Sequence, residues 1–577
     1  LVWFGARPQC ASVWQNPSAT DSVHFNDDHL YATSLISDLL PGAVTPLTHA
    51  IVAKAMDTSI RQAFVKYKLA KRIEDVPENI GLVSVDNHLF LDVTEISRLA
   101  EKQPEGFKEL IEISLCGEVL DTTSSDCWNL ILADFVTLVS RYFKLGSANK
   151  DACQKIVSLA ENYRIDLSGR DMEQRIFELN KQLGAFNTAT MDFFTILSTA
   201  YFLNTALYLV FIRALLTPAK SYALMLECLS DLQGYASSDI TASLISVARE
   251  MVLDNPRIAD DTPEGILASL RNVVGDSKAA LDAFMTNHGH RGFQEMELSC
   301  KTWGQNEADL AMYLHTIFST NLSDSGRAPR SPGYLNSVEE RIDAKILAPV
   351  KSLIDLAREA AVVSDTAQSQ LVKMLAEIKQ ACRQIGRQMA EQKQIPDADL
   401  VFFLTLDELS AVTSRPDTGG AEKFGYAPDW AKRAFARKQL FGTHKNFQFE
   451  RMQYGRPVPL APESPVDTPK NSVLKGRCGS PGVLVGKARV VRNLSDLDDL
   501  KAGEIIVTAF SDIGFAPYFS LAGALITEEG SENSTAAVAA RHLSLPHITQ
   551  VESATCTIKT GDTLSVNAAL GEITVLG

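Results

Sequence analysis

One short stretch of the chain concentrates side chains that could handle a phosphate group. The segment HGHRGFQEMEL places His288, His290, Arg291, Glu295 and Glu297 close together. An arginine binds phosphate through its forked N–H groups, and a nearby glutamate can orient the arginine or accept a proton from an acceptor hydroxyl. A histidine such as His290 can act as a general base near neutral pH. These residue types predict a phosphate-handling site.

The same residues also fit a structural role, in which an Arg–Glu pair locks helices together in a polar core. The His-x-His spacing could suggest a metal, but no third ligand accompanies it, so we predict no metal site. The nine cysteines are dispersed without CxxC pairs. A dispersed set of this kind is typical of reduced thiols, which predicts a cytoplasmic protein.

The elements that must position these residues are mostly helices. Apolar residues recur at three and four spacing through residues 344–392, which is typical of an amphipathic helix. The alternating segment 81–93 predicts a hairpin with its turn at Asp86 and Asn87. After residue 475, short β-type runs alternate with turns, and one helix is expected over 534–542. The pattern predicts a multidomain α+β protein with a large, mostly helical central domain.

The charge and the apolar pattern of the chain argue against two kinds of partner, nucleic acids and the membrane interior. A net charge of -15 argues against a nucleic-acid surface, because binding to the phosphate backbone requires clustered Lys and Arg. Residues 193–212 form an uncharged stretch of about 20 residues, long enough to span a bilayer. Polar residues interrupt it and no basic cluster flanks it on one side, so we expect a buried core helix and no membrane insertion.

Several motifs resemble the family of phosphoenolpyruvate-synthase-like and rifampicin-phosphotransferase-like enzymes. The clearest are GRCGSPGVLVGKARVV (476–491) and LAGALITEEGSENSTAAVAARHLSLPHI (521–548), which are similar to the mobile, swivelling phosphohistidine domain. VWFGARPQ (2–9) is similar to the strand that closes the ATP-grasp domain. LLPGAVTPLT (39–48) and FMTNHGHRGFQEMELSCKTW (284–303) resemble the central domain.

The resemblance implies a domain order and a relay. Residues 1–16 would end an upstream ATP-grasp-like domain, 17–453 would form the helical acceptor-binding domain, 454–475 a Pro-rich linker, and 476–577 a β/β/α swivelling domain. In the family, ATP phosphorylates a histidine of the swivelling domain, which then carries the phosphoryl group to an acceptor. ATP and Mg²⁺ are therefore expected only through the ATP-grasp domain, in cis or in a separate chain. A small organic acceptor is expected in the helical domain, because no pyruvate-binding barrel is recognisable.

The carrier position departs from the family pattern. Gly530 and Ser531 match the paired glycines, Ser534 matches the Ser/Thr that precedes the histidine, and Arg541 is in register. Thr535 then stands where the family has its phosphate-carrying histidine. A threonine phosphate is an ordinary ester, too stable to be passed on, and the hydroxyl lacks the nucleophilicity of imidazole. The relay is therefore expected to be interrupted at Thr535.

The resemblance also places the acceptor site. It implies that phosphohistidine meets its acceptor at the histidine- and arginine-containing segment, with the PGAVTPL loop nearby. The residues implied are His290, Arg291 and Glu295 for the chemistry, and Pro41, Gly42, Thr45 and Glu297 for binding.

Three interpretations of the departure stay open. The chain could be a pseudoenzyme that keeps the fold and a ligand, used for binding, as a scaffold or for storage. It could be an active phosphotransferase in which residue 535 is an engineered or misread position. It could also use another residue, although His542 on the same helix is more simply a surface histidine. A separate alternative is one subunit of a split phosphotransferase whose ATP-binding part is another chain. Ser531 and the acidic Glu532 both change the loop that should cradle phosphate, which favours the first interpretation.

Overall fold

The computed structural model describes most of the chain. The described residues are 20–22, 25–66, 70–76, 81–101, 107–116, 135–214, 217–230, 232, 234–235, 237, 239–318, 334–412, 429–460, 472–498 and 500–576. The segment 1–16, expected to end an ATP-grasp-like domain, lies outside these residues, as does 461–471 in the expected linker.

Two long helices organise the helical domain, α9 (Met172–Arg213) and α16 (Ala344–Glu391), which pack against each other. The apolar stripe of α16 is fully buried at positions such as Leu371, Leu375 and Ile378, as its three and four spacing predicts. Helices α4 (Lys54–Lys66) and α8 (Phe135–Asn162) pack alongside α9. The sequence-predicted helix over 344–392 therefore ends within one residue of the observed one.

Shorter helices complete this body. They are α2 (Ser34–Ser37), α3 (Pro46–Thr48), α5 (Val93–Ala100), α6 (Phe107–Cys116), α10 (Pro218–Cys228), α15 (Tyr334–Glu339), α17 (Leu406–Ala411) and α18 (Asp429–His444). Helix α9 is the one described helix that is long and apolar enough to cross a membrane. In its most apolar window, 83% of the residues are buried inside the protein, which is the placement of a core helix.

A small antiparallel sheet joins the two ends of the helical domain. Its strand order is β2-β3-β1-β4, with bounds Leu82–Val85, His88–Asp92, Leu30–Ala32 and Met452–Tyr454. The expected hairpin is β2–β3, and its turn residues Asp86 and Asn87 have positive φ angles of 48° and 67°. Asparagine and aspartate tolerate this left-handed backbone better than other non-glycine residues.

The C-terminal unit is built on an eight-stranded sheet of order β5-β12-β11-β7-β8-β9-β10-β6. The strands are β5 (Val473–Lys475), β6 (Arg477–Ser480), β7 (Val483–Val491), β8 (Ile505–Thr508), β9 (Ala524–Thr527), β10 (His547–Thr549), β11 (Thr563–Asn567) and β12 (Glu572–Val575). Strands β7 to β10 run parallel, and α19 (Thr535–His542) connects β9 to β10. Strand β5, whose residues fall within the expected linker 454–475, pairs with β12 in this sheet.

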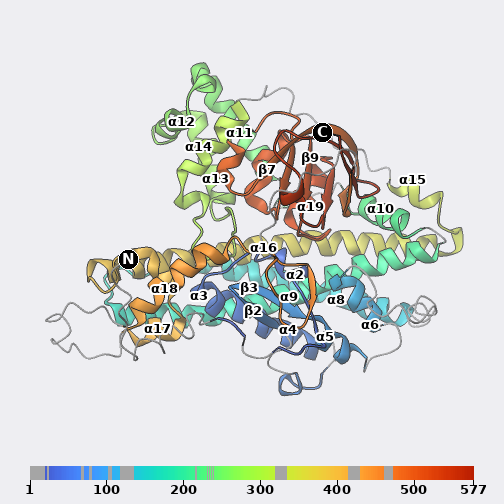
Figure 1. Ribbon diagram of the computed structural model, residues 1–577, viewed down its shortest axis with the longest axis horizontal. Helices are drawn as coiled ribbons and strands as arrows, with labels where there is room; N and C mark the ends of the chain where they lie inside the picture. Colours follow the sequence, from blue (N-terminus) through green and yellow to red (C-terminus); the bar gives the residue numbers. More distant parts are fainter. Residues whose placement is uncertain are drawn as a thin grey trace.

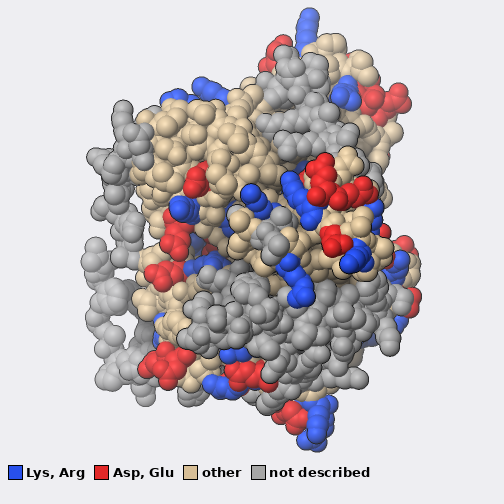
Figure 2. Space-filling model, turned by 90° about the vertical axis from the view of Figure 1, so that its right-hand side faces the viewer, with Lys and Arg blue, Asp and Glu red and all other residues tan. Residues whose placement is uncertain are grey.

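Four helices form a separate layer beside the C-terminal unit: α11 (Asp239–Asp254), α12 (Pro263–Leu270), α13 (Gly275–His288) and α14 (Glu307–Phe318). Their apolar side chains share one hydrophobic core with the C-terminal unit, where Ile513–Ser520 forms the 3₁₀ segment η8. In Figure 1 the C-terminal unit lies above α9 and α16, between α11–α14 on one side and α10 and α15 on the other. Across the described part of the face in Figure 2, basic and acidic side chains lie close to one another.

Together these elements confirm the predicted class, a multidomain α+β protein with a helical central domain and a C-terminal sheet unit.

Candidate functional site

The loop between β9 and α19 holds the carrier position. Gly530 has a φ of +118°, a conformation open in practice only to glycine. Ser534 caps the helix, since its Oγ accepts the N–H of Ala537 at 3.2 Å. Thr535 is therefore the first residue of α19. The buried Arg541 fixes the loop from behind by donating to the carbonyls of Glu532 (2.7 Å) and Gly479 (3.0 Å).

Thr535 lines a small cavity between the C-terminal unit and the helical domain. Its walls are Asn533, Thr535 and Val538 from the C-terminal unit, and Leu197, Ala200, Tyr201, Tyr235, Ala361, Ser364, Asp365 and Gln368 from the helical domain. The cavity measures about 30 Å³, which is room for about two water molecules. The docked arrangement therefore brings the carrier position against the polar positions of α16 and leaves no space there for an organic acceptor.

Arg291 belongs to a buried network of hydrogen bonds that connects to this cavity. Its Nε and Nη2 donate to the two carboxylate oxygens of Glu295 at 2.5 and 3.2 Å. Arg291 is 1% exposed and Glu295 is 6% exposed, so the pair is removed from water. Gln368 donates to Glu295 at 3.2 Å, and Ser237 links Arg291 to Asp365. Because Gln368 and Asp365 also line the cavity at Thr535, the network reaches the carrier position through them.

The PGAVTPL loop is held against the same segment. Glu297 accepts the N–H of Thr45 at 3.1 Å and its hydroxyl at 2.8 Å. Gln294 donates to the carbonyl of Pro41 at 3.1 Å, and Gly42 turns the chain with a φ of +72°. The structure therefore brings Pro41, Gly42, Thr45 and Glu297 close together, with Thr45 bonded to Glu297 and Pro41 bonded to Gln294.

His290 points elsewhere. Its Nε2 lies 3.2 Å from the hydroxyl of Ser369 on α16, and it is not among the residues that line the cavity at Thr535. Burial lowers the pKa of His290 to about 3, with the Arg291 charge as a further cause. His288 lies 3.3 Å from Asp239, and burial lowers its pKa as well. Both histidines are therefore neutral at pH 7.

Sequence reasoning missed the residues that join the two parts. Asp38, on the helical domain, accepts the backbone N–H of Ser531 at 2.9 Å. Asp512, on the C-terminal unit, accepts the backbone N–H of Gln294 at 2.5 Å. Asp365 and Gln368 were detectable, because they stand with Ser364 and Ser369 as a polar group within the mostly apolar repeat of 344–392. For Asp38, the only signal in the sequence was its position directly before the LLPGAVTPL motif.

Three carboxyl groups at this interface hold protons more tightly than usual. Burial raises the pKa of Asp38 to about 6, and hydrogen bonds from Ser531 and Tyr201 oppose the rise. Burial likewise raises the pKa of Asp512 and of Glu529 to about 7. Removal from water disfavours the charged carboxylate and is the largest cause in each case, although the Arg291 charge opposes the rise at Asp512.

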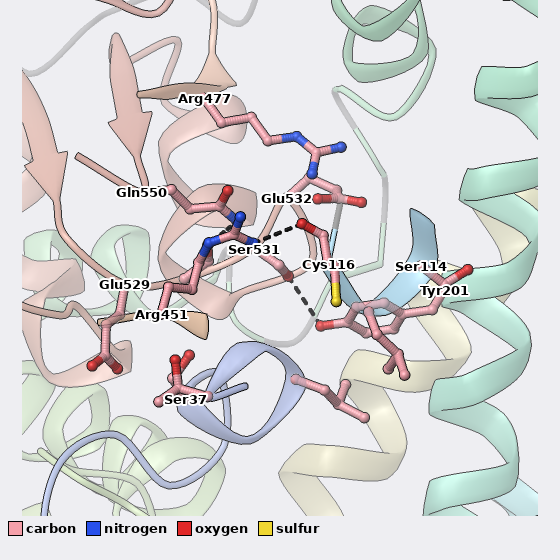
Figure 3. Close-up of a pocket in the computed structure, with 14 residues that line it drawn as sticks. Ser37, Ser114, Cys116, Tyr201, Arg451, Arg477, Glu529, Ser531, Glu532 and Gln550 are labelled. Carbon is pink, nitrogen blue, oxygen red and sulfur yellow. Dashed lines mark hydrogen bonds between the residues drawn. The ribbon is translucent and has the colours of Figure 1, made fainter. Parts of the chain in front are cut away.

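A second, apolar cavity of about 90 Å³ lies in the helical domain near the carrier loop. It is lined by Leu35, Ile60, Ala63, Phe64, Leu91, Ile96, Ile111, Ser114, Leu115, Phe194, Ser198, Tyr201 and Phe202. A polar cavity of about 20 Å³, drawn in Figure 3, shares Leu35, Ser114, Leu115 and Tyr201 with it and reaches the carrier loop at Gly530 and Ser531. Tyr201 also lines the cavity at Thr535, so one side chain borders all three spaces.

No cluster of three or more His, Cys, Asp or Glu side chains that could hold a metal occurs in the described part of the chain.

Two family models match the chain. "PEP-utilising enzyme, mobile domain" matches residues 500–571, and "Rifampicin phosphotransferase fourth domain" matches residues 197–364. The resemblance drawn from the sequence motifs is therefore confirmed for these two segments.

Three curated relatives extend the match. The chain is 24% identical to the rifampicin phosphotransferase of Bacillus subtilis over 364 residues, 59% of this chain and 40% of that protein. It is 35% identical to a probable phosphoenolpyruvate synthase of Pyrococcus abyssi over 99 residues, 17% of this chain and 12% of that protein. It is 26% identical to chondramide synthase cmdD of Chondromyces crocatus over 365 residues, 56% and 9% of the two chains. The chain thus spans less than half the length of these relatives, and its domain make-up is phosphotransferase-like.

Proposed function

We propose that this chain is the acceptor-binding and carrier part of a phosphotransferase-like protein whose relay is interrupted at Thr535. The observation that carries the proposal is the place of Thr535, the first residue of α19, facing the polar positions of α16. A histidine there could accept and release a phosphoryl group. A threonine would keep it as a stable ester. ATP and Mg²⁺ would come from an ATP-grasp domain, in the same polypeptide or in a separate chain.

We further propose that the ligand is a small, lipophilic organic molecule bound in the apolar cavity. The lining side chains of this cavity are almost all aliphatic or aromatic, and Tyr201 connects it to the carrier loop. A relative named rifampicin phosphotransferase supports an organic acceptor over pyruvate. Burial of apolar ligand surface would supply most of the binding free energy, while the few polar groups at its edge would set the orientation.

The experiment is a phosphorylation assay of the full chain together with its source of ATP-grasp activity. With radiolabelled ATP, we expect no acid-labile label on the wild-type protein, because no phosphoimidazole can form at residue 535. The Thr535→His variant tests whether the remaining machinery is intact, and Thr535→Ala is its matched control. Acid-labile label on the wild-type chain would overturn the proposal. Acid-stable label that is lost in Thr535→Ala would identify a dead-end phosphothreonine.

The alternative is a binding or scaffold protein with no phosphoryl chemistry at all, and the apolar cavity favours it equally. The two functions separate in the Thr535→His variant. If the chain is a scaffold without phosphoryl chemistry, Thr535→His should acquire no acid-labile phosphate label from ATP. It should still bind an apolar fluorescent probe in the cavity. A phosphotransferase-like chain with one missing group gains acid-labile label.

A further inference from the structure

Three consecutive residues of the carrier loop, Ser531, Glu532 and Asn533, all bind the helical domain. Ser531 donates its N–H to Asp38 Oδ1 at 2.9 Å and its hydroxyl to Asp38 Oδ2. Asn533 accepts from Asn204 on α9 at 2.6 Å. Glu532 accepts from Tyr222 on α10 at 3.1 Å.

Tyr201 completes the contact around Ser531. Its hydroxyl donates to Asp38 Oδ2 at 2.5 Å and lies 3.0 Å from the Ser531 hydroxyl. Figure 3 shows Tyr201 and Ser531 pointing toward one another across the boundary between the two parts. A backbone N–H of a helix-preceding loop commonly meets an anion. Here the N–H of Ser531 meets the carboxylate of Asp38, so a side chain of the helical domain takes the place of an external anion.

We propose that Ser531, Glu532 and Asn533 form an interdomain latch, centred on Asp38, that holds the C-terminal unit docked on the helical domain. The side chain of each residue makes a hydrogen bond to the helical domain, which glycine or an apolar residue at the same position could not make. The latch residues lie on three consecutive positions and reach three separate elements: the end of α2, α9 and α10. A loop fixed at three points resists both sliding and rotation.

The latch has a direct consequence for Thr535. Thr535 follows the latch within two residues, and the cavity that it lines holds only about two water molecules while the unit is docked. A small organic molecule can approach Thr535 only after the latch opens. This inference stands independently of the proposed function, because it concerns the docking of the two parts and not the chemistry at residue 535.

The chain contains its own reporter of docking. Cys478 belongs to β6 of the C-terminal unit, yet it is buried in a hydrophobic cluster whose other members come from the helical domain, including Leu203, Tyr222 and Leu226. Separation of the two parts therefore exposes the Cys478 thiol. Cys382, fully buried inside α16, stays covered whether or not the parts separate, and serves as the internal control.

The test measures the alkylation rates of Cys478 and Cys382 by mass spectrometry in the full chain. In Asp38→Ala and in Ser531→Gly we expect the rate at Cys478 to rise about tenfold or more, because hydrogen bonds across the boundary are lost. The rate at Cys382 should stay constant. Glu504→Gln is the matched control, since Glu504 pairs with Arg489 inside the C-terminal unit.

The alkylation rates distinguish an opened latch from an intact latch and from an unfolded chain. A Cys478 rate within twofold of wild type in both latch variants overturns the proposal. If Asp38→Ala also exposes Cys382, it has unfolded the chain, and Ser531→Gly decides the question because it removes only one half-buried hydroxymethyl group. Hydrogen exchange at the Ser531 amide, which is bonded to Asp38, gives an independent second measurement of opening.

Discussion

Replacing Arg291 by methionine should destabilise the protein more than any surface change. The guanidinium is 1% exposed and its partner Glu295 is 6% exposed, so the variant would leave a carboxylate in a site from which water is excluded. Removing one member of a buried ion pair costs about 3–5 kcal/mol. Gln368 still donates to Glu295 at 3.2 Å, so we expect a value near the lower end, about 3 kcal/mol.

The double variant Arg291→Met/Glu295→Leu tests whether the loss of stability comes from the unpaired charge of Glu295. With both charges gone, the apolar side chains fill a similar volume, and we expect about 2 kcal/mol of the loss to be regained. Urea unfolding followed by tryptophan fluorescence is a suitable assay. Trp303 is 1% exposed, and its backbone N–H is bonded to the Arg291 carbonyl at 2.8 Å.

The matched control is Arg489→Met, which breaks the more exposed Arg489–Glu504 pair. Its side chains are 17% and 15% exposed, so its loss should cost about 1 kcal/mol or less. The reasoning is refuted if Arg291→Met costs no more than this control, because the Glu295 carboxylate would then not depend on Arg291 for its place in the core. A double variant that is no more stable than Arg291→Met would likewise show that the two charges do not depend on each other.

Three further predictions concern the interface and the cavities. Because the pKa values of Asp38 (about 6), Glu529 and Asp512 (both about 7) are raised in the docked form, proton binding favours docking. This contribution is full below about pH 4 and is lost as the pH rises through 6 to 7, so small-angle scattering should show a larger extended fraction at pH 8 than at pH 5.5. An extended fraction that grows on acidification would reverse the sign of the argument. Gly530→Ala should lower the free energy of unfolding by about 1–3 kcal/mol, since φ at this position is +118°; an unchanged urea midpoint would contradict it. Ala63→Phe should fill the apolar cavity and abolish binding of an apolar fluorescent probe while the thermal midpoint moves little; retained binding would place the probe elsewhere.

Local patterns made much of the fold predictable. The helix over 344–392, the turn at Asp86 and Asn87, and the helix after Ser534 follow from periodicity, turn chemistry and capping, which depend on residues close in the sequence. The expected helix at 193–212 proved to be the C-terminal half of a longer one, because α9 already begins at Met172. The first half of α9 contains charged residues, so a search for long uncharged stretches does not find it.

The connections across the interface could not be predicted in the same way. Asp38 and Ser531 are 493 positions apart, and their bond depends on how two separately patterned units dock. A sequence shows that Ser531 is not glycine, but the partner of its hydroxyl is decided by tertiary packing. For Arg291 the sequence offered both a phosphate-binding role and a buried Arg–Glu pair, and only the packing that excludes water around it decides for the pair.

The hydrophobic core shared by α11–α14 and the C-terminal unit has a consequence for synthesis on the ribosome. Phe318, near the end of α14, emerges 173 residues before Val491, one of its partners in that core (491 minus 318). At about 5–20 residues per second, the apolar face of these four helices waits roughly 9–35 s for the strands that cover it. During that interval, chaperone binding or premature association between nascent chains competes with folding. Slowing elongation after residue 318 should therefore lower the yield of soluble protein more than slowing it before residue 239.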